Sequence, residues 1–387
     1  MEKLIELSNQ FFKPSEVYTS DYRDSLKRST IGKSLVQLDK LKNQKIQFAL
    51  IGIEVDQNTL NKGCSEAPDK IREYLYALFN PKDRIKMVDL GNLKAGNAKH
   101  DLYFALKIVL AELIQAKIKP IILGGGNDLV YGQFLAYQDF NFSVNIATID
   151  SRFDLGLSDQ ITAENYISKI ISDHSKQLFN YSNLGYQSYL VSQADIDLMN
   201  RLFFDSYRLG EIRENINHME PVLRDSDMVA FDMSSVRQAE SPGNINRGPN
   251  GLYADEVCQL AWYAGMSPKV SSFGLYEVNP DMDRDGQTAH LAAQIIWHYL
   301  DGASGLKIEH NIQKLNESDK YFVDVDVLEH KITFIHESES NLWWMEVPYP
   351  EGKDDQSILL ACNKDDYIKA SQGEVPDRLW KTYQKIS

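Results

Sequence analysis

Acidic residues follow three apolar runs of this chain, at positions where a metal-dependent enzyme would place its ligands. The three stretches are residues 124–128 (GGGND), 150–154 (DSRFD) and 232–234 (DMS). Carboxylate and amide oxygens favour a hard divalent cation such as Mg²⁺, Ca²⁺ or Mn²⁺. Arg152 lies between two of these aspartates and argues against a cation, because a guanidinium stays protonated at any working pH. What the chain can do depends on which of these two tendencies prevails.

The apolar runs before these residues are typical of buried parallel strands. Such runs occur at 48–55, 120–123, 144–149, 228–231 and 270–276, separated by helical stretches such as 102–114. This alternation predicts a three-layer α/β/α fold with a central, mostly parallel sheet of about eight strands. Because crossovers are right-handed, the carboxyl ends of the strands meet at one edge, where ligands bind. We therefore expect Asp150, Asp154, Asp232 and Glu277 to converge there.

Composition and charge restrict the classes of partner. The chain has 387 residues, of which 43% are hydrophobic and 25% charged, enough for a large core in a soluble protein. A formal net charge of −14 disfavours nucleic acid and anionic membranes, because like charges repel. Three widely spaced cysteines predict neither a disulfide nor a CxxC metal site. We expect no signal peptide and no run of roughly 20 apolar residues to span a bilayer, and so predict a cytoplasmic protein.

The two ends of the chain depart from the alternating pattern. Residues 1–45 predict an N-terminal helical preamble to an α/β domain at residues 46–305. Residues 306–387 predict a β-rich extension packed on that domain. Its expected strands lie at 322–327, 331–336, 341–347 and 357–361, and its closing helix lies at 376–386. Trp343 and Trp344 would face opposite sides of the third strand and belong to packing core.

Several segments, in the same order, resemble the ureohydrolase superfamily of arginases, agmatinases and formimidoylglutamases. Residues 232–243 (DMSSVRQAESPG) are similar, without a gap, to the family's D-x-D-x-x-D-P-x-x-x-P-G segment. Residues 277–280 (EVNP) match a further element, and residues 61–72 resemble its N-x-G…A-P…I-R segment. The resemblance covers roughly residues 46–301 and implies an arginase-like fold.

The resemblance also implies hydrolysis of amidine or guanidine C–N bonds. In the family, two Mn²⁺ ions held by four aspartates and two histidines activate a bridging hydroxide. By position, Asp150 and Asp232 match the bridging aspartates, and Asp154 matches a further carboxylate ligand. Glu277 matches a residue that contacts the substrate's cationic nitrogen in arginases.

Three of these six ligand positions are changed in this chain. Asn127 and Arg152 stand at the two histidine positions, and Ser234 replaces an aspartate. A metal ion beside a guanidinium would be repelled by about 4 kcal/mol per unit charge at ~4 Å and moderate dielectric. We therefore predict that the second metal is absent and that Arg152 takes its place, forking onto the nearby aspartates.

The remaining oxygen set predicts no tightly bound cofactor. Asp150, Asp154, Asp232 and Asn127 would hold at most one Mn²⁺, Mg²⁺ or Ca²⁺ ion weakly. The favoured hypothesis is a ureohydrolase-fold protein that has lost the binuclear site and binds a small cationic or amidine ligand, or a partner, without catalysis. One alternative is an active hydrolase of linear amidines that uses one residual ion, and another is a structural or assembly protein. Family habit favours a homo-oligomer, and the particular amidine or amino acid is not specified.

Overall fold

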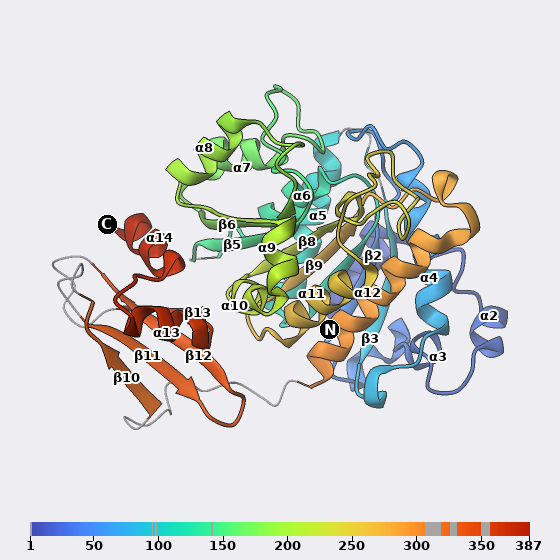
Figure 1. Cartoon of the computed structure of the whole chain (residues 1–387). Coiled ribbons are helices and arrows are strands. Elements are labelled where there is room, and N and C mark those ends of the chain that lie inside the picture. The colour runs from blue at the N-terminus through green and yellow to red at the C-terminus, as the bar shows by residue number, and fades with distance from the viewer. Residues whose placement is uncertain are drawn as a thin grey trace.

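A nine-stranded sheet forms the centre of the computed structural model (Figure 1). The structure describes residues 2–94, 96, 99–140, 142–305, 319–325, 331–349 and 357–387. The strand order is β1-β3-β2-β4-β9-β8-β5-β6-β7, and every neighbouring pair is parallel except β1 with β3. The bounds are β1 Phe12–Lys13, β2 Phe48–Gly52, β3 Met87–Leu93, β4 Lys119–Leu123, β5 Val144–Ile149, β6 Leu178–Tyr186, β7 Asp205–Arg208, β8 Met228–Asp232 and β9 Ser272–Tyr276. The predicted mostly parallel sheet is confirmed, and β1 adds a short strand that the sequence analysis did not expect.

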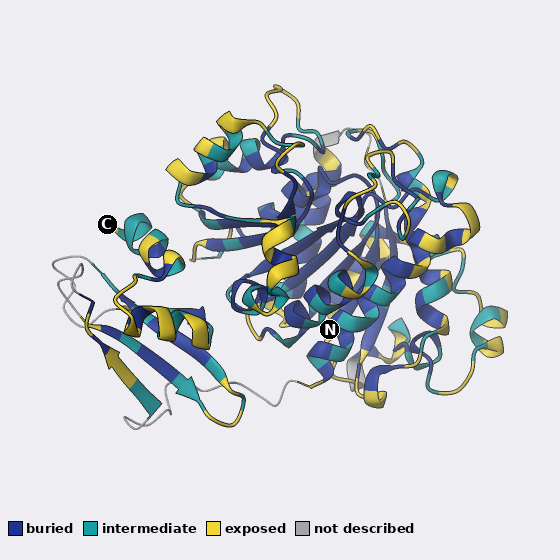
Figure 2. Cartoon of the chain, in the orientation of Figure 1, coloured by how far each residue is buried: buried dark blue, intermediate teal, exposed yellow. Residues whose placement is uncertain are grey.

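Helices cover both faces of this sheet because its strands are apolar on both sides (Figure 2). One core cluster joins Leu50 and Ile121 to helices α4 (Ala67–Ala77), α11 (Ala254–Met266) and α12 (Gln287–Ser304). The other joins Ile51 and Ile122 to α1 (Glu2–Phe11), α5 (Lys99–Gln115), α6 (Leu129–Leu135) and α7 (Tyr166–His174). Full burial of each such aliphatic side chain contributes about 1.5–3 kcal/mol. The two clusters are the outer interfaces of the predicted three-layer fold.

Shorter helices lie around these layers. They are α2 (Ser20–Ser25), α3 (Ile31–Ser34), α8 (Gln193–Arg201), α9 (Leu209–Glu214) and α10 (Met219–Arg224). Among the described residues, no helix combines the length and the apolar character that crossing a bilayer requires.

A separate antiparallel sheet is built near the C-terminus, as the alternating pattern predicts (Figure 1). Its strands, in order, are β10 (Lys320–Val323), β11 (Ile332–Glu337), β12 (Leu342–Pro348) and β13 (Ser357–Cys362). The end of the expected strand 322–327 and the expected boundary at 306 fall outside the described residues. Helices α13 (Lys364–Ser371) and α14 (Asp377–Ile386) follow. Helix α13 was not predicted from the sequence, although Asn363 and Asp366 form a capping box at its start.

The two tryptophans of β12 lie in different apolar clusters, on opposite faces of the small sheet. Arg224 on α10 connects this sheet to the main one. Its guanidinium donates to the carbonyl oxygens of Trp343 and Cys362, each at 3.0 Å, and lies 4.5 Å from the Trp344 ring centre. Its Nε also donates to Glu220 Oε1 at 2.8 Å, whereas its Nη1 has no partner in the described structure, and these contacts attach the small sheet to α10.

Candidate functional site

The predicted site residues follow four strands that are neighbours in the sheet. Asn127 follows β4, Glu277 follows β9, Asp232 ends β8 and Asp150 follows β5, and these strands lie in the order β4-β9-β8-β5. Parallel strands end at the same edge, so the four side chains lie close together, as the topological argument predicts.

Asn127 connects the members of this cluster by hydrogen bonds. Its side-chain nitrogen donates to Asp154 Oδ2 at 3.1 Å and to Asp150 Oδ2 at 3.3 Å. Its backbone N–H donates to Glu277 Oε1 at 2.8 Å. The turn that aims this N–H has positive φ at Gly124 and Gly125 (75° and 77°), a conformation that glycine adopts without strain. The glycine stretch therefore positions Asn127 between the acidic residues.

Three buried aspartates form the acidic part of the cluster. Asp150, Asp154 and Asp232 are 1%, 8% and 8% exposed. Burial raises the pKa of Asp154 to about 7, although its hydrogen bond with Asp150 opposes the rise. Burial also raises the pKa of Asp150 well above its usual range, and the charges of Asp154 and Asp232 add to this. The cluster therefore holds protons at neutral pH that isolated aspartates would have released.

Asp232 is held by Ser234, the residue that stands where the family has a further aspartate ligand. The backbone N–H of Ser234 donates to Asp232 Oδ1 at 2.6 Å. Burial raises the pKa of Asp232 to about 6, and the hydrogen bonds from Ser234 oppose the rise. Ser234 thus orients and stabilises the aspartate that it follows, in place of offering a carboxylate of its own.

Arg152 affects the aspartates through space. Its guanidinium lowers the pKa of both Asp154 and Asp232 by its charge. Within the described part of the chain, however, it makes no ion pair, so the predicted fork onto the aspartates is not formed. The backbone holds this residue: its N–H donates to Asp150 Oδ1 at 2.9 Å, and its carbonyl accepts from Asn183 Nδ2 at 2.6 Å.

Replacing Arg152 with alanine should destabilise the protein at pH 8 more than at pH 5. Without the guanidinium the folded-state pKa values of Asp154 and Asp232 rise further, so the cost of ionising them grows above pH 7, whereas at pH 5 both are mostly protonated. Thermal melts of Arg152→Ala and of the charge-conserving control Arg152→Lys, in chelator, measure this difference. An alanine variant that melts like the parent at both pH values contradicts a role as counter-charge.

The cluster does not fit a two-ion centre. Its donors are oxygens without an imidazole, Ser234 lacks the carboxylate, and Arg152 brings a positive charge close to Asp154 and Asp232. Asn127 turns its nitrogen toward two carboxylates, since only the NH₂ group can donate to them. Among the described residues, no group of three His, Cys, Asp or Glu side chains is arranged to hold a metal ion.

Two acceptor atoms of the cluster lack a partner within the described structure. Asn127 Oδ1 and Glu277 Oε2 are buried and accept no hydrogen bond within the usual distance and angle limits, although the side chains of Thr59 and Asn61 lie close enough to Glu277 to lower its pKa. Burial is the larger cause that raises the pKa of Glu277 well above its usual range, and repulsion from the charge of Asp232 adds to it. An unpaired buried acceptor costs about 1–3 kcal/mol, a cost that a hydrogen-bond donor from outside the chain would offset.

The structure adds three residues that the sequence analysis did not select. Tyr166 is fully buried and its hydroxyl lies 3.4 Å from Asn127 Nδ2. Asn61 and Asn244 donate to the Glu277 carbonyl at 3.0 and 2.7 Å, and Glu277 has a positive φ of 65°. The N-x-G similarity could have identified Asn61, whereas residues 163–166 carried no recognisable signal for Tyr166.

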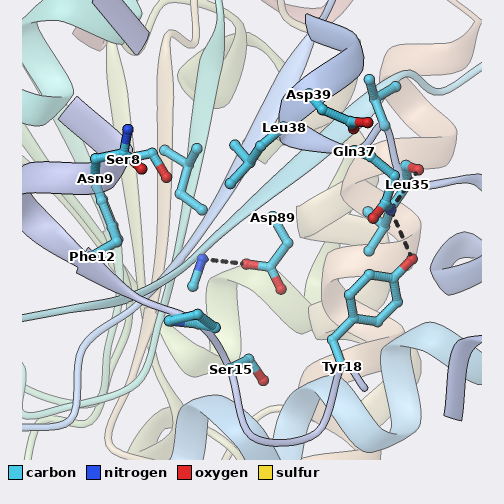
Figure 3. A pocket seen from close by; sticks show the side chains of 14 residues that line it. Ser8, Asn9, Phe12, Ser15, Tyr18, Leu35, Gln37, Leu38, Asp39 and Asp89 are labelled. Carbon is cyan, nitrogen blue, oxygen red and sulfur yellow. Dashed lines mark hydrogen bonds between the residues drawn. The ribbon is translucent and has the colours of Figure 1, made fainter. Parts of the chain in front are cut away.

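A hollow of about 420 Å³ lies elsewhere, between the N-terminal segment and β3 (Figure 3). Its one acidic group on the strand, Asp89, accepts from the Gly91 N–H at 2.9 Å and from Arg72 at 3.0 Å. None of the predicted site residues lines it. The Asp89 carboxylate already accepts hydrogen bonds from the protein, so the strand-end cluster remains the candidate functional site.

Folds with an open parallel α/β sheet usually bind their ligands at the carboxyl edge of the sheet, and the acidic cluster of this chain lies at that edge. Residues 46–301 match the sequence model of the arginase family, and the chain belongs to this family. It is similar to a formimidoylglutamase from Staphylococcus aureus, 28% identical over 268 residues, which cover 65% of this chain and 85% of that enzyme.

Solved structures share the fold. The formimidoylglutamase from Bacillus subtilis superposes with a TM-score of 0.63 at 22% identity, covering 72% of this chain and 93% of that one. The formiminoglutamase from Trypanosoma cruzi, solved with Mn²⁺, gives a TM-score of 0.62 at 19% identity, covering 67% and 94%. The expected resemblance and the arginase-like fold are therefore confirmed.

Proposed function

We propose that this chain binds the cationic head group of a small linear amidine at the strand-end cluster and hydrolyses one of its C–N bonds. The observation that carries this proposal is the pair of unpartnered buried acceptors, Asn127 Oδ1 and Glu277 Oε2. An amidinium offers several N–H donors and a positive charge, which match these acceptors and the surrounding carboxylates. The names of the formimidoylglutamase relatives support a reaction on this class of compound.

The carboxylates can supply acid–base chemistry to such a reaction. With a pKa of about 7, Asp154 is suited to take a proton from a water that attacks the amidinium carbon. The protonated side chain then returns a proton to the departing nitrogen as the C–N bond breaks, so that water is consumed and ammonia or an amine leaves. We place at most one weakly held Mn²⁺, Mg²⁺ or Ca²⁺ ion on the oxygens of Asp150, Asp154, Asp232 and Asn127, where it would add positive charge.

A second candidate is binding without turnover. It is favoured by Arg152 and Ser234, which leave the cluster unsuited to the binuclear chemistry of the family. The acceptor pair serves this candidate equally well. We further propose that the chain forms a homo-oligomer; a purely structural or assembly role has less support, because the acceptor pair would then have no use.

A single comparison separates these functions. The protein, with and without added Mn²⁺, is incubated with formimidoyl and guanidino compounds, while ammonia, urea and formamide release and calorimetric binding are measured. Product release supports hydrolysis, and saturable binding without product supports the second candidate. If no amidine or guanidine binds at millimolar concentration, both proposals are wrong.

Replacing Glu277 with glutamine should weaken amidine binding by about 2 kcal/mol, or roughly thirtyfold, because a bound cation favours the ionised form of the Glu277 carboxyl and glutamine cannot ionise to form that charge-assisted bond. Glutamine keeps an oxygen for the Asn127 N–H, and loss of a buried carboxylate should not lower the melting temperature. Glu240→Gln is the matched control, since Glu240 pairs with Arg237 at 2.9 Å outside the cluster. Equal affinity in the Glu277 variant and the parent would exclude this carboxylate from the ligand site.

A further inference from the structure

Basic residues gather at the amino ends of three strands, on the edge of the sheet opposite the acidic cluster. The stretches before β2, β3 and β4 repeat a pattern of a basic residue, isoleucine, and lysine or glutamine: residues 45–47 (KIQ), 84–86 (RIK) and 117–119 (KIK). The isoleucines are buried, at 2–5% exposure, while the first basic residue of each stretch is exposed.

Pairing of the strands brings these stretches together. β2 lies between β3 and β4, and Phe48 is in register with Met87 and with Lys119. The backbone of Gln47 bonds to both sides: its N–H donates to the Lys86 carbonyl at 2.9 Å, and its carbonyl accepts from the Lys119 N–H at 2.8 Å. Three basic stretches, far apart in the sequence, therefore lie side by side.

A cavity of about 500 Å³ opens between them. Five basic side chains line it, those of Lys45, Arg84, Lys86, Lys117 and Lys119, and its described lining contains no aspartate or glutamate. None of the five forms an ion pair with another described residue, whereas the neighbouring Lys82, outside the lining, lies 3.8 Å from Asp301. Such a concentration of positive charge is notable in a chain with a net charge of −14.

The ammonium group of Lys119 lies in this cavity with no carboxylate among the described lining residues to offset its charge. Lys119 is largely buried, and its ammonium donates to the Ser267 carbonyl at 3.0 Å, with no carboxylate beside it. Burial lowers its pKa to about 8. A buried ammonium without an acidic partner destabilises the folded state, and an anion in the cavity would relieve that cost.

We propose that this cavity is a binding site for a small phosphate-bearing anion. Five cationic side chains favour a ligand with several negative charges. Lysines bind phosphate oxygens as point charges, and Arg84 can bind two oxygens at once. The volume suits a small molecule. The site lies at the amino edge of the sheet, so its ligand does not compete with one at the carboxyl edge, and the proposal is independent of the amidine reaction.

Inorganic pyrophosphate is the probe for this site. We expect saturable calorimetric binding and a rise in melting temperature that sodium chloride of equal ionic strength does not reproduce. Lys119→Met and Lys86→Gln should each weaken binding by roughly tenfold, because each removes one charged contact. Lys119→Met also removes the buried charge, so it should fold at least as stably as the parent.

Two controls keep the result specific. Lys70→Gln removes a lysine that pairs with Glu73 and does not line the cavity. Glu277→Gln changes the opposite edge of the sheet. Both variants should bind pyrophosphate with the affinity of the parent. If pyrophosphate does not bind at millimolar concentration, the proposal is wrong. It is equally wrong if the cavity variants and Lys70→Gln lose affinity to the same extent, since binding would then follow net charge alone.

Discussion

Replacing Asp154 with asparagine is expected to stabilise the protein at pH 8 by up to about 4 kcal/mol, and to raise its melting temperature by several degrees. Burial raises the pKa of this aspartate from its ordinary 3.8 to about 7. A tenfold change in proton affinity corresponds to about 1.4 kcal/mol, so ionising the folded protein carries this cost. Asparagine has no charge to bury.

The sign of the effect follows from linkage. Below about pH 4 both the folded and the unfolded chain hold the proton, and parent and variant differ little. Between about pH 4 and pH 7 the unfolded aspartate releases its proton while the folded one retains it, so the stability of the parent falls as pH rises. Above that window the full difference is present. The advantage of Asp154→Asn should therefore grow with pH and then level off.

The geometry also favours this substitution. Asp154 has a positive φ of 53°, which asparagine tolerates about as well as aspartate. Its amide oxygen can still accept from Asn127, and its NH₂ group can donate to Asp150. Melts in chelator at several pH values measure the effect, because a bound ion would require the carboxylate.

Asp283→Asn is the contrasting control. Asp283 is buried too, but accepts the N–H groups of Thr288 and Ala289 at 2.8 and 2.9 Å at the start of α12, so its replacement should lower the melting temperature. A folded Asp154→Asn protein that melts below the parent at pH 8 would show that its carboxylate is stabilising.

Restoring the three changed ligands should strengthen the binding of Mn²⁺ over that of the parent. The variant combines Asn127→His, Arg152→His and Ser234→Asp. Removing the guanidinium abolishes a repulsion of about 4 kcal/mol per unit charge at close range, and the new imidazoles and carboxylate add direct ligands. We expect Mn²⁺ affinity to rise at least about a hundredfold. Elemental analysis after dialysis and the shift of melting temperature with MnCl₂ report it.

Arg237→His is the control for this experiment. It introduces a histidine in the same segment, but the parent Arg237 pairs with Glu240 and lies 4.3 Å from the Tyr253 ring centre, away from the cluster. It should leave Mn²⁺ binding unchanged. A well-folded triple variant that still binds no Mn²⁺ would mean that the cluster has diverged beyond these three positions.

The relatives and the site support different steps of one function. Similarity to formimidoylglutamases supports a reaction on amidines, and the unpartnered Glu277 oxygen supports capture of a cationic group. Arg152 and Ser234 set this chain apart from a binuclear enzyme. Turnover in the absence of added metal would assign the proton transfers to the aspartates themselves, and turnover only with Mn²⁺ would assign a role to a residual ion.

Local sequence patterns were enough to predict which residues share the carboxyl edge of the sheet. Apolar runs that end at Asp150, Asp232 and Glu277 specify strands, and right-handed crossovers leave one arrangement of their ends. The β-rich C-terminal sheet and the opposite facing of Trp343 and Trp344 also followed from alternation along a strand. These features depend on local periodicity, which a sequence records directly.

The interactions among the clustered groups could not be predicted in the same way, because they depend on contacts between distant segments. The sequence permitted Arg152 to fork onto the aspartates, but in the described structure Asn127 bonds to Asp150 and Asp154, and Ser234 bonds to Asp232. Likewise, the basic stretches converge only because β2 lies between β3 and β4. Hydrogen-bond directions and proton positions depend on distances of tenths of an ångström between segments far apart in the chain, and residue order does not encode those distances locally.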